Sequence, residues 1–451
     1  MATIPVKRSM TASVYDILNA IRNNATSNYR DFVPKATDTK SLRQIGAIMM
    51  EYQAVQNEFL TALWNRIGRV ILSTKMYENP WSMFKRGQLD YGETVEEIFT
   101  NIAKPFQYNP ERAEQTIYKR QIPDVRSAFH TMNYQKFYKT TTTQEQLRQA
   151  FLSEGGVEQL INDIISSLLK AANYDEFQVM KYLLFRNILN GRMYPKEIDA
   201  VTTANMKSII ADVKSISNKL EFLKPYYNVA GVQTTSDKND QFILIDTDFQ
   251  AHMDVEVLAS AFNMNKAEFM GHIVPVDGFG ELDTDRLAIL FEDDDSYVPI
   301  TPEQLQALSI IPCVLVDRSY FMIFDNLIEN TQKFNEEGLY WNYWLHTWKT
   351  FSVSPFANAV MFLPATPSVV SVSVSPDSAT ITAGASIQLT PVVAVLNFAP
   401  QTVKYESDSD TIVVSDMGVV TALAGASGSA TITVTSTFDP TKFDTMTVTV
   451  A

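Results

Sequence analysis

Apolar residues at helical spacing predict two helices near the start of the chain. In VYDILNAIRNN (14–24) they are Val14, Ile17, Leu18 and Ile21. A second run with this spacing extends from Ser41 to Ile67 and stops at Gly68, a residue type that readily terminates a helix. Between the two, YRDFVPKATDT (29–39) contains a proline and is predicted to be an extended strip.

The strongest helical pattern lies at residues 155–190, where two apolar stripes follow one another. Gly191 and Pro195 close this pattern. A continuous helix of this length would span about 50 Å, at roughly 1.5 Å per residue. Asn173-Tyr174-Asp175 is a candidate bend within it.

Residues 69–125 have β-prone ends around a middle that contains Asn-Pro and glycine turns. This segment has too little apolar surface to fold alone, because an isolated two-stranded hairpin is marginally stable in water. We therefore expect an arm that lies on something else, such as a neighbouring subunit.

Residues 200–325 mix helical and strand patterns. QFILIDTDF (241–249) and IPCVLVDRSYFMIFD (311–325) are predicted to be buried strands, and the second is predicted to fold as a hairpin at Asp317-Arg318. VEVLASAFNMNKAEFMG (255–271) is predicted to be a pair of helices. The mixture indicates one α+β domain in which strands and helices are segregated.

An aromatic segment follows at residues 338–363, which hold three of the five tryptophans. A carbohydrate-binding platform is one reading of this density. Strands or a helix that place the aromatic side chains in a core or an oligomer interface are the favoured reading.

The composition changes after a short linker with two prolines, PATPSV (364–369). The remaining residues alternate valine or isoleucine with threonine and serine, as in VSVSVSPDSATITAGASIQLT (370–390). Such alternation, punctuated by turn residues, predicts a β-sandwich of about 80 residues.

The length and charge of the chain narrow its class. A chain of 451 residues is expected to form two or three domains. A formal net charge of −14 argues against a protein that grips nucleic acid, which requires basic stripes. The pairs Lys7-Arg8 and Lys85-Arg86 are too short for such a stripe and are predicted to lie in solvated turns.

A single cysteine, Cys313, excludes an intrachain disulfide and lies in an apolar run. We expect it to be a buried core residue of a protein that folds in a reducing cytoplasm. The N-terminal residues show no apolar core of signal-peptide length, and no stretch reaches the length of a membrane span. The chain is therefore expected to be soluble and not exported by the usual route.

The sequence shows no constellation that indicates catalysis. None of its histidines, His130, His252, His272 and His346, lies in HExxH spacing. The acidic run 292–295 lacks the spacing of a calcium loop, and 278–280 is a bare GxG. A pair of carboxylates acting as general acid and base stays open. The arm, the extended strip, the long helix and the appended sandwich favour a protein that contacts copies of itself.

Several segments resemble a known family in the same order along residues 14–363. They are VYDILNAIRNNATSNYRDFVPKAT, VQNEFLTALWNRIGRVI, GETVEEIFTNIAKPFQYN, LASAFNMNKAEFMG, GLYWNYWLHTW and SPFANAVMF. These segments resemble the major capsid (major head) proteins of short-tailed Bacillus phages. The last part resembles the bacterial immunoglobulin-like group 2 domain through its strands and its turns at Gly384 and Gly418. That group usually has tryptophan where this chain has Tyr405.

The resemblance implies the α+β fold of tailed-phage and herpesvirus major capsid proteins, followed by an all-β immunoglobulin-like sandwich. The parts it implies are an N-terminal arm with helices (1–66), an extended loop (67–125), a peripheral domain with a long spine helix (126–195 plus 311–363), an axial domain (196–310) and the immunoglobulin-like domain (364–451). Residues 282–308 look like an insertion relative to the family pattern. There is no long cleavable segment before Val14, which implies a separate scaffolding protein.

The function implied by the resemblance is structural, with no catalytic, cofactor-binding or metal-binding residues. The chain is expected to self-assemble as pentamers and hexamers into an icosahedral or prolate phage head that encloses double-stranded DNA without specific binding. Its implied partners are other copies of itself, a scaffolding protein during assembly and a portal at one vertex, with no membrane. The virion is its expected location, after assembly in the host cytoplasm, and the immunoglobulin-like domain is expected to reinforce or decorate the shell.

Two other readings stay open. An encapsulin-like compartment shell would share the fold but normally lacks a terminal sandwich. A bacterial surface adhesin would be expected to carry an export signal and often tandem sandwich repeats, and neither pattern is seen in this sequence.

Overall fold

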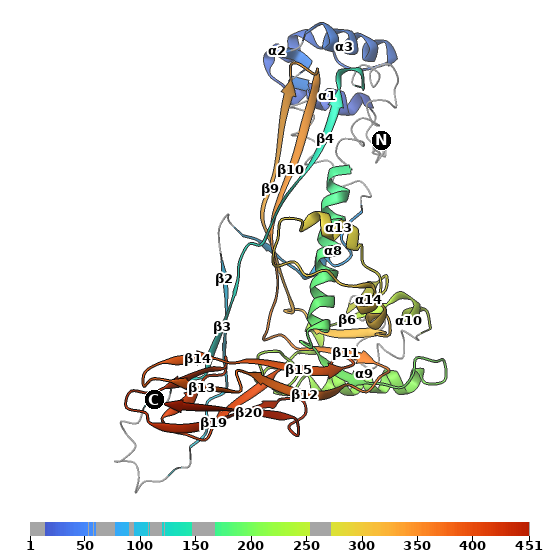
Figure 1. Cartoon of the computed structure of the whole chain (residues 1–451). Helices are drawn as coiled ribbons and strands as arrows, with labels where there is room; N and C mark the ends of the chain where they lie inside the picture. The colour runs from blue at the N-terminus through green and yellow to red at the C-terminus, as the bar shows by residue number, and fades with distance from the viewer. Residues whose placement is uncertain are drawn as a thin grey trace.

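The computed structural model describes residues 14–52, 54–56, 58–59, 77–89, 94–106, 108, 120, 122–146, 167–252 and 272–450. Figure 1 shows an elongated subunit in which long strands rise to a group of helices at one end. One long helix runs beside these strands, a mixed region of strands and helices lies below it, and an all-strand unit with the C-terminus lies at the other end.

The N-terminal group begins with the short helices α1 (Val14–Asn24), α2 (Ser27–Phe32) and α3 (Thr39–Glu51). The predicted extended strip was partly wrong, because its first residues belong to α2. The hydroxyl of Thr26 accepts a hydrogen bond from the Tyr29 N–H and so starts a helix before the proline is reached.

The second predicted helix begins at a capping box in which Asp38 and Ser41 exchange hydrogen bonds. It ends at Glu51, because Tyr52 adopts an extended conformation and its ring packs beside Phe32. Part of the run up to residue 59 is again helical, whereas residues 60–67 lie outside the described residues.

The long helix α8 (Ser167–Leu189) confirms the strongest sequence prediction over its described part, and residues 155–166 lie outside that part. The helix is unbroken through the candidate bend at 173–175. Gly191 ends it with φ +62°, donating to the Ile188 carbonyl, while the next N–H reaches the Asn187 carbonyl. This pair of bonds is the Schellman motif, which favours glycine at the left-handed position.

A long four-stranded sheet stands beside α8, with strand order β1-β9-β10-β4. The strands are β1 (Lys85–Gln88), β4 (Tyr134–Thr143), β9 (Phe321–Asn335) and β10 (Tyr340–Val353). Trp341, Tyr343 and Leu345 point to the same face of β10 and pack against α1, α3 and the first turns of α8. The aromatic segment thus contains strands, and one side of β10 is core.

A five-stranded sheet forms the mixed region, in the order β5-β11-β8-β6-β7. The strands are β5 (Tyr194–Glu197), β6 (Gln241–Asp246), β7 (Ile273–Val276), β8 (Cys313–Asp317) and β11 (Ala359–Leu363). One face packs on α8, α13 (Thr284–Leu290) and α14 (Pro302–Leu308). The other face packs on α9 (Met206–Lys219) and α10 (Thr247–His252). The short turns η2 (Ser82–Phe84) and η5 (Lys238–Asp240) precede β1 and β6.

The predicted hairpin at Asp317-Arg318 was wrong. Strand β8 pairs with β6 on one edge and β11 on the other, so no edge is left for β9, which belongs to the long sheet. The five-stranded sheet also takes strands from both sides of the predicted boundary between 310 and 311. The predicted helix pair at 255–271 lies outside the described residues.

An antiparallel hairpin projects from the body, formed by β2 (Val95–Thr100) and β3 (Val125–His130). We call these two strands and the described residues between them the hairpin arm. The segment predicted as one arm is divided in the structure, because Trp81 and Phe84 are buried in the central core and β1 joins the long sheet. The second strand of the arm also continues past residue 125.

The C-terminal part is an all-β sandwich, as predicted. Its strands are β12 (Ser368–Ser375), β13 (Ser378–Ile381), β14 (Ser386–Gln388), β15 (Thr390–Leu396), β16 (Val403–Ser407), β17 (Ile412–Val414), β18 (Val419–Ala422), β19 (Gly428–Ser436) and β20 (Phe443–Val450). They form the sheets β13-β20-β19-β16, β14-β18-β17 and β12-β15. The linker before β12 is tied to the body, since the Thr366 hydroxyl donates to Glu197 at 2.6 Å.

Candidate interaction surface

Three ionisable side chains on α8 are buried: Asp175, Glu176 and Lys181. An ionised group in a protein interior requires partners, because removing it from water costs several kcal/mol. Each of the three finds its partners on a different part of the chain, so the helix is tied to several elements at once.

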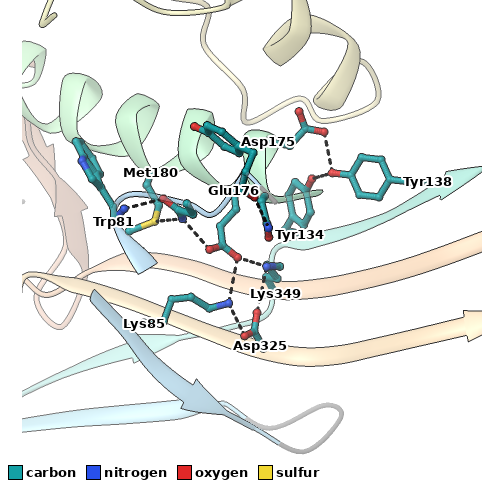
Figure 2. Close-up of polar contacts among 12 residues, drawn as sticks. Trp81, Lys85, Tyr134, Tyr138, Asp175, Glu176, Met180, Asp325 and Lys349 are labelled. Carbon is teal, nitrogen blue, oxygen red and sulfur yellow. Dashed lines mark hydrogen bonds and ion pairs between the residues drawn. The ribbon is translucent and has the colours of Figure 1, made fainter. Parts of the chain in front are cut away.

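Glu176 lies at the centre of a group of four charges, which we call the charge cluster: Lys85, Glu176, Asp325 and Lys349 (Figure 2). Lys85 Nζ lies 3.2 Å from Glu176 Oε2 and 2.6 Å from Asp325 Oδ2. Lys349 pairs with Glu176 and lies 3.1 Å from Asp325 Oδ1. Two positive and two negative groups therefore balance within the body.

A β-bulge brings Asp325 into this cluster. Along β10 the alternation that buries Tyr343 and Leu345 also turns Lys349 inward. On β9, Leu327 is opposite Trp348 and Asp325 is opposite Lys349, which leaves Asn326 as the extra residue. The bulge thus places Asp325 beside Lys349, where simple alternation would place Asn326.

The neighbouring Asn79 completes the environment of Glu176. Its side-chain N–H donates to Glu176 Oε1 at 2.7 Å, and its Oδ1 accepts the Trp81 N–H at 2.9 Å. Lys85 was predicted to lie in a solvated turn, and this prediction was wrong, because its ammonium group bonds inside the cluster. A charge on the inward face of a buried strand or helix was the available signal for the site.

The pKa values of two cluster members are shifted by their neighbours. Burial opposes ionisation of Asp325, but Lys349 and Lys85 outweigh it and hold the pKa of this carboxyl below its usual value. Burial likewise opposes the charge on Lys85, but Glu176 and Asp325 outweigh it and raise the pKa of that amine. The folded state therefore favours the ionised form of both groups.

Acidification is expected to remove the contribution of Asp325. A carboxyl whose folded pKa is depressed stabilises the protein above its unfolded pKa of about 3.9, and this contribution is lost as pH falls through the lower folded pKa. Asp325→Asn should therefore lose less stability than the wild type between about pH 4 and pH 2. Urea unfolding followed by tryptophan fluorescence measures this. The exposed Asp199→Asn is the control, and equal acid slopes for all three proteins would contradict the prediction.

A second charged group ties α8 to α13 and β4. Arg286 donates to both oxygens of Asp175, at 2.6 and 2.9 Å, and the hydrogen bond to Asp175 is the main cause of the raised pKa of Arg286. The Tyr138 hydroxyl donates to Asp175 at 2.7 Å and lies 2.9 Å from the Tyr134 hydroxyl. Burial raises the pKa of both tyrosines. Lys181 bonds Asp277 at 2.6 Å.

These charged groups hold the body together and do not resemble an active site. His130 bonds Ser352, His272 contacts the Gln241 carbonyl, and His346 lies beside Phe137. His252 is the last residue of α10. Within the described ranges, no three His, Cys, Asp or Glu side chains gather as metal ligands would.

The other residues considered from the sequence have structural surroundings. Cys313 is buried in the central strand of its sheet, where burial raises the pKa of the thiol. In the acidic run 292–295, Asp294 accepts hydrogen bonds from the backbone and hydroxyl of Ser296. The adjoining rings of Phe291 and Tyr297 stack and pack beside Tyr182 of α8.

The hairpin arm has one face on its own subunit. Phe99 stacks on Phe356 with ring centroids 5.6 Å apart, and the Ser354 hydroxyl donates to Glu97 at 2.8 Å. His130 lies 3.3 Å from Glu97 and is buried at the base of the arm. These contacts hold this face of the arm, from His130 at its base to Phe99 opposite Arg126, against the region that follows β10.

The opposite face of the arm exposes large apolar side chains, interspersed with Glu96, Thr100 and Ser127. Ile98 is 61% exposed and Phe129 is 65% exposed. Val125 lies on the same face, and Ile122, beyond the strand, is 82% exposed. A soluble monomer seldom exposes neighbouring large apolar side chains, and such a patch marks an interaction surface.

The long sheet has a second such surface, which we call the open face. It is the side of β10 opposite the one that packs on α1 and α3, and it carries Trp344 and His346. Phe137 and Lys139 of β4 lie opposite these residues across the strands. The Lys139 ammonium lies 5.6 Å from the Trp344 ring. Within the aromatic segment, one side of β10 is thus core and the other side lies at the surface.

In the described part of the chain, no helix is both long enough and apolar enough to cross a membrane.

Comparisons with known proteins give a consistent result. The family described as Phi29-like phage major capsid protein matches residues 18–363, and the bacterial Ig-like domain (group 2) matches residues 368–445. The chain is 35% identical over 429 residues to the major capsid protein of Bacillus phage B103, which covers 93% of this chain and 89% of that protein. It is 36% identical over 384 residues to the major capsid protein of Bacillus phage PZA, covering 84% and 80%.

Among solved structures, the capsid structure of Staphylococcus phage Andhra resembles this one with a TM-score of 0.51 at 15% identity. The match covers 65% of this chain and 86% of that chain. At this identity the likeness concerns the fold alone.

Proposed function

We infer that this protein assembles as a capsid subunit, because the chain belongs to the Phi29-like phage major capsid protein family. It is a structural component of the virion that self-associates into the shell of a phage head, and it is not an enzyme. Its body has the fold of tailed-phage capsid proteins, and its last part is a bacterial immunoglobulin-like domain of group 2.

We propose that the subunits form pentamers and hexamers in which the hairpin arm of one copy lies on a second copy. The uncovered apolar face of the arm around Ile98 and Phe129 carries this proposal. The open face, with Trp344 and Phe137, supplies an aromatic surface of matching character on the second copy. A contact between two different surfaces repeats from copy to copy and closes into rings.

The domain division that we propose differs from the one expected from the sequence, because it follows which strands share a sheet. The extended loop is the hairpin arm, residues 95–130. The peripheral domain is built on α8 and the long sheet, and the axial domain on the five-stranded sheet with β8 and β11. The N-terminal arm with its helices and the immunoglobulin-like domain keep the boundaries expected from the sequence, 1–66 and 364–451.

We further propose that the shell assembles in the host cytoplasm around a separate scaffolding protein, with a portal at one vertex. In this proposal the icosahedral or prolate shell encloses double-stranded DNA without binding it specifically. The formal net charge of −14 supports the last point, since a strongly basic wall would retain the genome. The immunoglobulin-like domain is proposed to reinforce the shell.

Ile98→Asp tests the arm contact. Ile98 is exposed in the subunit, so the change should leave the subunit folded, whereas a carboxylate buried at each contact should weaken assembly. We expect the association constant of each contact to fall at least about tenfold, which corresponds to roughly 1.4 kcal/mol per contact. Because a shell repeats this contact many times, the yield of closed shells should fall by more than that factor. Electron microscopy of the protein, expressed with and without its scaffolding partner, measures the yield.

The matched control is Ile289→Asp, at an exposed isoleucine on α13, away from both surfaces. Shells or rings formed by the wild-type protein would support the proposed assembly into pentamers and hexamers. A wild-type protein that stays monomeric both with and without the scaffolding partner would overturn this proposal. If Ile98→Asp forms shells as efficiently as the wild type, the arm face is not the contact.

A further inference from the structure

The sandwich contacts its own subunit at two separate places, and we propose that it supports the hairpin arm and fixes the direction in which the arm points. The inference rests on the proposed role of the arm in shell contacts. It names the partner of the sandwich as the arm of the same chain.

The first contact seats the sandwich on the end of α8. In the turn between β15 and β16, Asn397 and Phe398 have left-handed φ values of 53° and 58°. Phe398 packs against the central core of the body, and the Asn397 side chain donates to the Thr366 carbonyl at 2.8 Å. The carbonyl oxygen of the buried Ala399 lies 2.6 Å from the position that a Cβ on Gly191 would occupy. The sandwich is thus held in a fixed place on the body.

The second contact is made by the turn at 415–418, between β17 and β18. The side chain of Gln388 donates to a carbonyl of this turn at 2.9 Å. The ring of Tyr405 fills the space beside Gly418, 2.8 Å from where a Cβ would lie. Because this turn is held on two sides, it presents Asp416 in a defined position.

Asp416 faces the arm. Arg126 Nη2 lies 3.8 Å from Asp416 Oδ2, while Nη1 of the same guanidinium donates to the Ala230 carbonyl at 2.5 Å. Arg126 is opposite Phe99 in the register of the arm, beyond His130, so the sandwich meets the arm at the level where Phe99 stacks on Phe356. The Asp416 carboxylate is 93% exposed, so the pair adds little to global stability. Its effect is geometric, because it adds a restraint from the sandwich to those that the body supplies at Phe99 and Ala230.

Hydrogen exchange of the full-length, unassembled subunit tests the contact with the arm. In Asp416→Lys the turn repels Arg126, and we expect amides of residues 122–130 to exchange about threefold faster. Asp410→Lys makes the same charge change at another exposed site of the sandwich and should leave the arm unchanged.

A second variant tests the seat on α8. Phe398→Ser removes the ring that packs on the core and should accelerate exchange both at 122–130 and at the end of α8. Phe443→Ser is the control, at an exposed phenylalanine of β20. Slow hydrogen exchange of the β19 amides in Phe398→Ser shows that the sandwich is still folded. If these amides lose their protection, the sandwich has unfolded, and the inference is then tested by Asp416→Lys alone.

Unchanged exchange of the arm in Asp416→Lys overturns the inference, whether or not shells form. A failure of the proposed function has a different result: the wild-type chain forms no shells although its arm responds to Asp416→Lys. Failure of the inference is therefore seen in hydrogen exchange of the unassembled Asp416→Lys variant, whereas failure of the proposed function is seen in shell formation by the wild-type protein.

Discussion

Lys349→Met is expected to destabilise the body of the subunit by about 3 kcal/mol, the lower end of the cost of breaking a buried ion pair. Methionine retains the apolar length of the side chain but leaves Glu176 and Asp325 with only Lys85 as a charged partner. Urea unfolding of unassembled subunits measures the change. All five tryptophans precede residue 364, so their fluorescence reports on the body and not on the sandwich.

Lys170→Met is the matched control, since Lys170 is an exposed lysine on α8 and the same substitution there should cost little. The double variant Glu176→Met/Lys349→Met leaves Lys85 and Asp325 as a pair. It should be more stable than the sum of its single changes by at least about 1 kcal/mol. Equal effects of Lys349→Met and Lys170→Met would show that the charge cluster is not a stabilising part of the body.

Gly191→Ala is expected to have the second largest effect. The substitution meets two obstacles: a left-handed backbone with φ +62°, and a Cβ placed 2.6 Å from the Ala399 carbonyl oxygen and 3.0 Å from the Gln401 nitrogen. The first costs roughly 1–2 kcal/mol. The second requires the sandwich to move off the end of α8, because both neighbouring atoms belong to its backbone.

Gly231→Ala separates these two costs. Gly231 has φ +63°, almost the same backbone conformation, and no atom lies within 4 Å of its Cβ position. We expect Gly191→Ala to lose about 1–3 kcal/mol more than Gly231→Ala, the usual cost of overpacking. The same urea titration measures both, and equal losses would mean that the sandwich does not press on Gly191.

Elements defined by local patterns were predictable from the sequence. The end of α8 at Gly191 follows from a glycine placed directly after an apolar stripe. The sandwich follows from the alternating strand segments in 370–390 and elsewhere in the last part of the chain, separated by turn residues. Family resemblance added the order of the parts, which periodicity does not contain, and the comparisons confirm that resemblance.

Pairing between distant strands was not predictable in the same way. The pattern of 311–325 shows two apolar strands and a turn, which is equally compatible with a hairpin and with a crossing between sheets. What decided the outcome was that β8 is hydrogen-bonded on both edges, by β6 and β11. Those partners come from positions far away in the sequence.

The candidate site likewise has parts that local sequence patterns predict and parts that depend on contacts between distant segments. The arm was predicted from its shortage of apolar surface, yet which face would be uncovered depends on the contacts of Phe99 and His130 with the body. The charge cluster was not predicted, because Lys85 and Asp325 are unremarkable within their own segments. They become partners only through the bulge at Asn326 and the approach of α8.

The sequence by itself therefore determined the helices and strands with strong periodicity, the glycine that ends the long helix and the family of the chain. Periodicity is a local property, because the spacing of apolar and polar residues along one segment does not depend on which other segment packs against it. The tertiary structure decided which sheet each strand joined, where the buried charges found partners, and how the sandwich was seated on Gly191. Those outcomes depend on electrostatic balance and close packing between segments that are distant in the sequence.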